Sequence, residues 1–110
     1  MRQGAIWMAD LNPVIGSEQK GIRPVVIISG NAMNDNFGIS IICPLSSKIK
    51  NFAGCIVLSP DTCNGLELES EIITFQIRTI SQSRLTRKIG VITAEQLEKV
   101  KEGLGEVLKY

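Results

Sequence analysis

The chain has 110 residues, which fits a single domain spanning residues 1–110 and is long enough to bury a core without covalent cross-links. Hydrophobic residues make up 44% of the sequence and charged residues 21%, a balance that excludes a disordered chain. Twelve Lys and Arg against eleven Asp and Glu give a formal net charge of +1. This excludes a uniformly basic surface, so any contact with a polyanion has to come from local clustering of cations.

The cysteine and histidine content limits which cross-links and metal sites the chain can form. The three cysteines, Cys43, Cys55 and Cys63, are an odd number and form no CxxC pair, and the sequence has no histidine. This argues against a disulfide framework and a zinc site, so we expect no metal and no cofactor. No apolar run reaches the roughly 18 residues of a membrane span, and the N-terminus lacks a signal-peptide pattern. We therefore expect a cytoplasmic protein with no membrane contact.

Short β segments separated by turn residues are expected over the first two-thirds of the chain. The Val25–Ser29 run is rich in β-branched residues and suits a strand buried on both faces. Pro44 is expected to end the strand Ser40–Cys43. Asn31–Asn36 is expected to add a helical turn. The expected strands are Ala5–Ala9, Val25–Ser29, Ser40–Cys43, Cys55–Leu58, Ile72–Ile80 and Lys88–Ile92.

The C-terminal segment changes to helical periodicity. Thr93 and Gln96 fit a capping box, and Glu95 with Lys99 forms a supportive i,i+4 pair. Gly103 and Gly105 weaken the last turns unless they allow close packing on a neighbour. An apolar stripe runs along one face: Leu97, Val100, Leu104, Val107 and Leu108. The pattern predicts a mainly β fold, a strongly curved sheet or small barrel closed by one C-terminal helix.

The stretch 16–24 is the most polar segment between two apolar strands and is the first candidate site. Pro24 biases Arg23 to an extended conformation, which places Arg23 at a rigid strand edge where a catalytic cation could be held. Glu18 is the only acid in this loop. A solvated hairpin with a Glu18–Arg23 salt bridge is the plain structural alternative.

Two further polar groups follow or lie within expected strands. Ser46, Ser47 and Lys48 come after the strand Ser40–Cys43 and could hold phosphate oxygens, with a simple Ser/Thr turn as the alternative. Gln76 and Arg78 alternate with Phe75, Ile77 and Thr79, so this polar pair could line a groove for unpaired bases. The alternative for the pair is an ordinary solvent-facing side of a strand.

Taken together, these motifs resemble the MazF/PemK type of toxin from bacterial toxin–antitoxin systems. The matching blocks cover nearly the whole chain: G-A-I-W from Gly4, L-N-P-V-I-G-S-E-Q-K-G-I-R-P-V-V-I-I-S from Leu11, I-I-C-P-L-S-S-K from Ile41, Q-I-R-T-I from Gln76 and S-R-L from Ser83. The resemblance implies an SH3-like barrel with a C-terminal helix, working as a homodimer. It also implies a metal-independent endoribonuclease that cuts single-stranded RNA, often mRNA, at short sequences.

The resemblance assigns roles to individual positions. It places an essential arginine at Arg23, an essential hydroxyl at Ser46 and the acid of the loop at Glu18. RNA-binding roles are expected for the neighbouring polar side chains: Ser17, Gln19, Lys20, Ser47, Lys48, Gln76 and Arg78. The implied partner is a MazE-like antitoxin whose acidic tail occupies the RNA groove, and the complex of the two is expected to bind operator DNA.

Two positions depart from the family pattern. Ser46 stands where the family usually has threonine, so the hydroxyl is kept and the methyl that fixes its rotamer is lost. Phe75 stands where some relatives carry a catalytic aspartate, so a mechanism that depends on this aspartate is not open to this chain. A different class of function also stays open: the same small barrel resembles that of gyrase-poisoning toxins, which bind a protein and cut nothing. A regulatory nucleic-acid binder without catalysis is a third alternative, disfavoured by the near-zero net charge.

Overall fold

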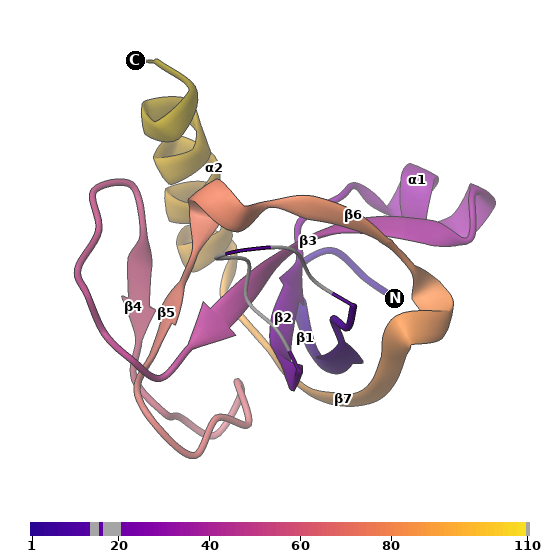
Figure 1. Ribbon diagram of the computed structural model, residues 1–110, viewed down its shortest axis with the longest axis horizontal. Helices are drawn as coiled ribbons and strands as arrows, with labels where there is room; N and C mark the ends of the chain where they lie inside the picture. The colour runs from indigo at the N-terminus through magenta and orange to yellow at the C-terminus, as the bar shows by residue number, and fades with distance from the viewer. Residues whose placement is uncertain (14–15, 17–20, 110) are drawn as a thin grey trace.

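The computed structural model describes residues 1–13, 16 and 21–109. Seven strands and a long C-terminal helix dominate the chain, and Figure 1 shows the strands curling around a central space with the helix α2 against one side. The elements in chain order are β1 (Ala5–Asp10), β2 (Ile22–Ile27), α1 (Asn31–Asn36), β3 (Ile39–Ser46), β4 (Ile56–Leu58), β5 (Ser70–Ile72), the 3₁₀ helix η1 (Thr74–Gln76), β6 (Arg78–Ser81), the 3₁₀ helix η2 (Gln82–Arg84), β7 (Leu85–Val91) and α2 (Ala94–Lys109).

All seven strands belong to one antiparallel, strongly curled sheet. Its path runs β4-β5-β3-β2-β1-β7, and β6 pairs with β3 beside that path. No strand pair closes the path among the described residues, but the loop after β4 reaches β7, where Val91 N donates to the carbonyl oxygen of Cys63 at 2.9 Å. This architecture confirms the mainly β, barrel-like fold with a C-terminal helix.

Two hydrophobic clusters lie on opposite faces of the central strands. Ile6, Val26 and Cys43 are aligned across β1, β2 and β3 and belong to the cluster that packs under α2. Val25 and Ile27 point the other way, into the second cluster. Because side chains alternate along a strand, a central strand with two covered faces needs a continuous apolar run. The expectation that this run is buried on both faces is confirmed.

Two prolines lie inside strands, which corrects the expected boundaries. β3 does not stop at Pro44 but continues to Ser46, and Pro44 aligns with Val25 while its carbonyl oxygen accepts from Ile73 N at 2.9 Å. A proline lacks only the N–H, so its carbonyl can still take part in sheet hydrogen bonding. β2 likewise begins at Ile22 and ends at Ile27, rather than spanning Val25–Ser29.

The expected strand Ile72–Ile80 is broken in two. Ile72 aligns with Leu45 and Arg78 aligns with Ile42, so five residues (73–77) face only two residues (43–44) on β3. The surplus forms η1, fastened by a hydrogen bond from Thr74 Oγ1 to the carbonyl oxygen of Gly54 at 2.9 Å. A period-2 pattern does not reveal an insertion of this kind, because the flanking residues remain β-like.

Helix α2 follows the sequence closely. Thr93 N donates to Gln96 Oε1 at 2.8 Å and Gln96 N donates to Thr93 Oγ1 at 3.0 Å, which confirms the capping box. Val100 is fully buried in the main cluster, whereas Leu108 is 81% exposed, so the apolar stripe ends before Leu108. None of the described helices combines the length and hydrophobicity needed to cross a membrane.

Candidate active site

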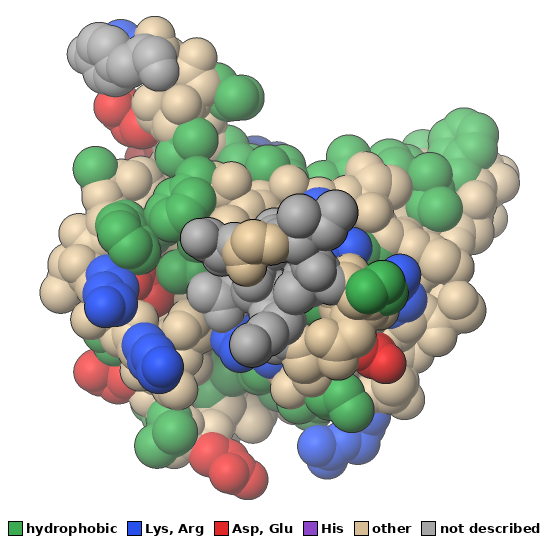
Figure 2. Space-filling model, viewed as in Figure 1, with side chains coloured by type: hydrophobic (Ala, Val, Ile, Leu, Met, Phe, Trp, Pro, Cys, Tyr) green, Lys and Arg blue, Asp and Glu red, His purple; other side chains and the backbone are tan. Residues whose placement is uncertain are grey.

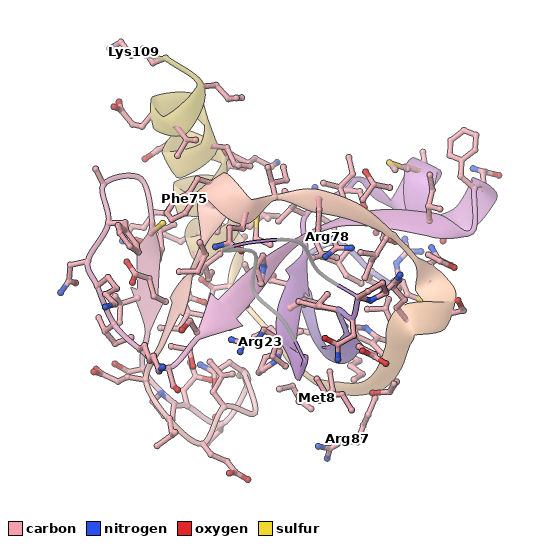
Figure 3. The ribbon with its side chains drawn as sticks, viewed as in Figure 1. Met8, Arg23, Phe75, Arg78, Arg87 and Lys109 are labelled. Carbon is pink, nitrogen blue, oxygen red and sulfur yellow. The ribbon has the colours of Figure 1, made fainter. Side chains whose placement is uncertain are left out.

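Arg23 lies inside β2, where its backbone is held between two strands. It aligns with Ala9 of β1, and its Nη1 donates to the carbonyl oxygen of Leu45 on β3 at 3.3 Å. The register between β2 and β3 aligns Val25 with Pro44, two residues before Ser46. The half-buried arginine therefore stands at the end of β3, as Figure 3 shows.

Ser46 is the last residue of β3 and is only 8% exposed. Its Oγ accepts a hydrogen bond from Lys48 N at 3.2 Å, which is the hydroxyl-stabilised turn that the sequence left open as an alternative. Accepting this bond leaves the hydroxyl proton available for donation. Ser47 and Lys48 follow and are exposed.

A buried carboxylate supports the turn that follows β3. Glu71 of β5 aligns with Ser46 and is fully buried. Its two oxygens accept from the backbone N–H groups of Lys50 and Phe52, each at 2.9 Å. Such charge-assisted bonds fix the chain path beyond Ser46. No sequence signal indicates this role, because a single glutamate in a β segment looks like a solvent-facing residue.

A pocket of about 570 Å³ opens beside Arg23. One wall comes from β7 and the other from the segment before β5. Cations lie on the strand side, while Glu67 and Leu68 lie on the segment side. The lining residues are Met8, Arg23, Pro24, Leu45, Ser47, Gly65, Leu66, Glu67, Leu68, Ser70, Arg87, Lys88 and Ile89.

Two glycines hold the pocket walls together. A Cβ atom on Gly65, which has φ +67°, would collide with the backbone of Ile89, and one on Gly90 would collide with the backbone of Asn64. Only glycine lets these two backbone segments approach each other this closely. The segment carrying Glu67 and Leu68 is therefore packed backbone to backbone on β7.

The structure brings some of the expected site residues together and separates others. Arg23 and Ser47 line one pocket, and Arg23 donates to the carbonyl oxygen of Leu45, the residue before Ser46. Gln76 lies in η1, and Arg78 in β6 aligns with Ile42, further along β3. Ser17, Glu18, Gln19 and Lys20 lie outside the described residues.

The direction of the side chains of residues 75–78, in η1 and at the start of β6, differs from the expectation. Phe75 and Ile77 are 43% and 40% exposed, whereas Gln76 and Arg78 are half-buried. The polar pair therefore faces inward and the apolar pair faces solvent. Figure 3 shows Arg78 beneath the β6 ribbon and Phe75 near α2.

Arg87 and Lys88 are pocket residues that the sequence reading missed. Both are exposed and lie on β7 beside Trp7 and Met8. On the face seen in Figure 2, Lys and Arg side chains stand apart among apolar and acidic ones and form no continuous basic surface. The sequence signal for Arg87 and Lys88 is two successive cations within an expected strand. This signal does not indicate that the strand pairs with β1 beside the pocket. Among the described residues, no group of three His, Cys, Asp or Glu side chains could hold a metal ion.

The comparisons with known proteins define the class. The profile of the PemK-like, MazF-like toxins of type II toxin–antitoxin systems matches residues 2–108, and the chain belongs to this family. It is 36% identical over 105 residues to Endoribonuclease EndoA of Bacillus subtilis, covering 94% of this chain and 90% of that relative. It is 35% identical over 109 residues to Endoribonuclease MazF9 of Mycobacterium tuberculosis, covering 94% and 92%.

Solved structures agree with this assignment. The crystal structure of MazF from Deinococcus radiodurans matches with a TM-score of 0.86 at 25% identity, covering 100% of this chain and 97% of that chain. A chain of the crystal structure of MazE-MazF (Form-II) from the same organism matches with a TM-score of 0.80 at 25% identity, covering 99% of this chain and 96% of that chain.

Proposed function

We propose that this chain is a toxin of the endoribonuclease type, which cuts single-stranded RNA, including mRNA, at a short sequence. The relatives named endoribonucleases support the activity. The observation that carries the proposal is that Arg23 is hydrogen-bonded to the carbonyl oxygen of Leu45, one residue before Ser46, and lines one pocket with Ser47. A protein that only binds another protein does not need a rigidly held arginine next to two hydroxyls.

The proposed chemistry uses the nucleophile that RNA itself carries. The 2′-oxygen attacks the adjacent phosphorus and loses its proton, and the bond from phosphorus to the 5′-oxygen breaks. The products are a 2′,3′-cyclic phosphate and a 5′-hydroxyl that gains a proton. The enzyme has to accept one proton, donate one and stabilise charge on the phosphorane-like transition state.

Arg23 is the charge stabiliser in this scheme. Its planar guanidinium matches two phosphate oxygens, and its contact with the carbonyl oxygen of Leu45 orients it before substrate arrives. Ser46 donates its hydroxyl proton to a phosphate oxygen while it accepts from Lys48 N. Glu18, the acid of the loop, is proposed as the general base or as the residue that orients Arg23.

The remaining polar residues are proposed to bind RNA outside the reacting phosphate. Ser47 lines the pocket, Lys48 follows it, and both are exposed and suit phosphate contacts. Gln76 and Arg78 face inward from η1 and β6, which suits contacts to bases laid across the sheet. Ser17, Gln19 and Lys20 are proposed to clamp the strand from the loop side.

The proposed partners follow from the family. An antitoxin of the MazE kind is proposed to neutralise this toxin, supported by the MazE-MazF crystal structures among its structural neighbours. A homodimer is proposed as well. Phe52 and Phe75 support it, because they form an exposed edge-to-face pair with ring centroids 5.1 Å apart, and exposed aromatic pairs suit an interface. Binding of operator DNA by the toxin–antitoxin complex stays a prediction.

One experiment tests the activity and separates it from the gyrase-poison alternative. The purified protein is incubated with a long single-stranded RNA, and new 5′-hydroxyl ends are mapped. We expect cuts at one short motif, unchanged in excess EDTA because the chemistry needs no metal. An Arg23→Ala protein that is folded but inactive completes the test. Intact RNA with the wild-type protein, together with inhibition of gyrase, would establish the alternative instead.

A further inference from the structure

Arg87 of β7 lines the same pocket as Arg23 of β2. Pro24, Met8 and Arg87 align across β2, β1 and β7, and residues aligned in this way project to the same face. All three line the pocket. Strands lie about 4.8 Å apart, so Arg87 stands roughly 10 Å from Pro24, two strands away. Figure 3 shows Met8 between Arg23 and Arg87.

The guanidinium of Arg87 makes no hydrogen bond or ion pair that would hold the described part of the chain together. Arg87 is exposed, and no described residue forms a hydrogen bond or ion pair with its side chain. Arg2, by contrast, donates to both oxygens of Asp35, and Arg84 donates to backbone carbonyl oxygens. An arginine at a pocket edge with unused donors is suited to an anionic group of a ligand.

The pocket between these two arginines has the size and lining for one nucleotide. Its volume of about 570 Å³ lies within the usual range of small-molecule sites. Met8, Leu66 and Leu68 give apolar surface for the face of a base, and Arg87 with Lys88 gives positive charge at the rim. Glu67 supplies an acceptor for an exocyclic amino group.

From this arrangement we propose that Arg87 binds the phosphate of a nucleotide that flanks the cleaved bond, with its base held in the pocket between β7 and residues 65–70. The proposal rests on the RNA-cutting function and adds a second phosphate site to it. Arg23 serves the reacting phosphate and Arg87 serves a neighbouring one. An RNA strand then runs from the end of β3 across Met8 to β7.

The test is binding of a short RNA that cannot be cut. A fluorescent oligonucleotide with 2′-O-methyl groups throughout has no free 2′-hydroxyl, so its affinity is measured without catalysis. We expect Arg87→Ala to weaken binding roughly fivefold and to lower the slope of log K against log salt by about 0.7, the loss of one phosphate contact. Arg87→Lys should keep the slope, because the charge remains.

Lys101→Ala is the matched control, since it removes one exposed cation on α2, a helix that contributes no residue to the pocket. It should leave affinity and slope unchanged. Equal effects of Arg87→Ala and Lys101→Ala would overturn the proposal. It would also be overturned if Arg87→Ala spared RNA but weakened binding of an acidic peptide such as oligo-glutamate, since Arg87 would then serve a protein partner.

The two proposals fail in different ways. If the wild-type protein neither cuts RNA nor binds the modified oligonucleotide, both the function and the Arg87 site are wrong. If it cuts and binds RNA but Arg87→Ala matches the wild type in affinity and salt slope, only the Arg87 site is wrong. Melting curves for each variant confirm that the compared proteins are folded.

Discussion

Arg23 Nη1 donates to the carbonyl oxygen of Leu45 across two neighbouring strands, at 3.3 Å. The acceptor lies one residue before Ser46, so the bond ties the guanidinium to the end of β3. A group used to stabilise transition-state charge gains from being held in place before the reaction. This contact gives the arginine a fixed plane beside the two serines.

Replacing Arg23 by lysine should therefore impair catalysis while the protein stays folded. Lysine keeps the charge but loses the planar fork that can hold two oxygens, and we expect cleavage to slow by about 10²-fold. Arg23 is half-buried, so the melting temperature should change little. Single-turnover cleavage of one labelled RNA measures the rate. A lysine variant as fast as the wild type would show that charge alone is sufficient.

Ser46 and Ser47 should respond differently to loss of their hydroxyls. Ser46→Ala removes the acceptor for Lys48 N and should cost about 0.5–1.5 kcal/mol of stability in addition to slowing cleavage. Ser47→Ala changes an exposed residue and should leave stability unchanged while weakening RNA binding. Ser46→Thr keeps the hydroxyl and adds a methyl that restricts its rotamer, so cleavage should be retained or raised.

Denaturant curves and cleavage rates for the three serine variants check this prediction. If Ser46→Ala loses stability but cuts RNA at the wild-type rate, the hydroxyl serves only the turn. Rescue by Ser46→Thr separates a chemical role from a packing effect.

Local sequence patterns predicted the parts of the fold that depend on neighbours in the chain. The capping box of α2 depends only on Thr93 and Gln96, which lie three positions apart in the sequence, and it is present in the structure. The run Val25–Ser29 predicted burial on both faces because β-branched residues suit such a strand, and Val25, Val26 and Ile27 are fully buried. Arg23 was predicted at a strand edge because Pro24 restricts its backbone.

Features that depend on pairing between distant segments could not be predicted in this way. The path of β3 through Pro44 is set by its alignment with Val25 and by the Ile73 N–H. The break in the 72–80 segment reflects the mismatch between its length and that of β3. Arg87 became a pocket residue only because β7 lies beside β1, and sequence alone does not give that partner.

The two glycines of α2 provide a sharp test of its packing. Gly103 is buried, and a Cβ there would overlap the carbonyl oxygen of Gly54, whereas a Cβ on Gly105 meets nothing within 4 Å. We expect Gly105→Ala to stabilise the protein by about 0.5–1 kcal/mol, since alanine is the better helix former. Gly103→Ala should destabilise it by roughly 1–3 kcal/mol through overpacking.

Urea unfolding of both glycine variants gives the two free energies directly. Because the residues lie two positions apart on one helix, the helix propensity gain is shared and the difference reports the contact with Gly54. Equal stabilisation by both alanines would mean that α2 does not rest on Gly54.

The buried thiol of Cys43 links stability to alkaline pH. Burial raises the pKa of Cys43 from 9.0 to about 12, and the nearby Cys55 thiol adds to the effect. In the unfolded chain the thiol ionises at its ordinary pKa, while in the folded chain it stays protonated. The folded state therefore holds one more proton between these two values, and its free energy of unfolding should fall as the pH rises through this window.

The Cys43→Ala variant isolates this contribution from other groups that titrate at high pH. Below about pH 8 the two proteins should differ by a constant offset from the lost packing, about 1 kcal/mol. Above that pH the wild type should lose stability faster than the variant, and urea curves at a series of pH values measure the difference. A thiol reagent at mildly alkaline pH should label the exposed Cys63 quickly and Cys43 only on unfolding. Rapid labelling of Cys43 in the folded protein, or parallel pH profiles for the two proteins, would contradict a deeply buried thiol beneath α2.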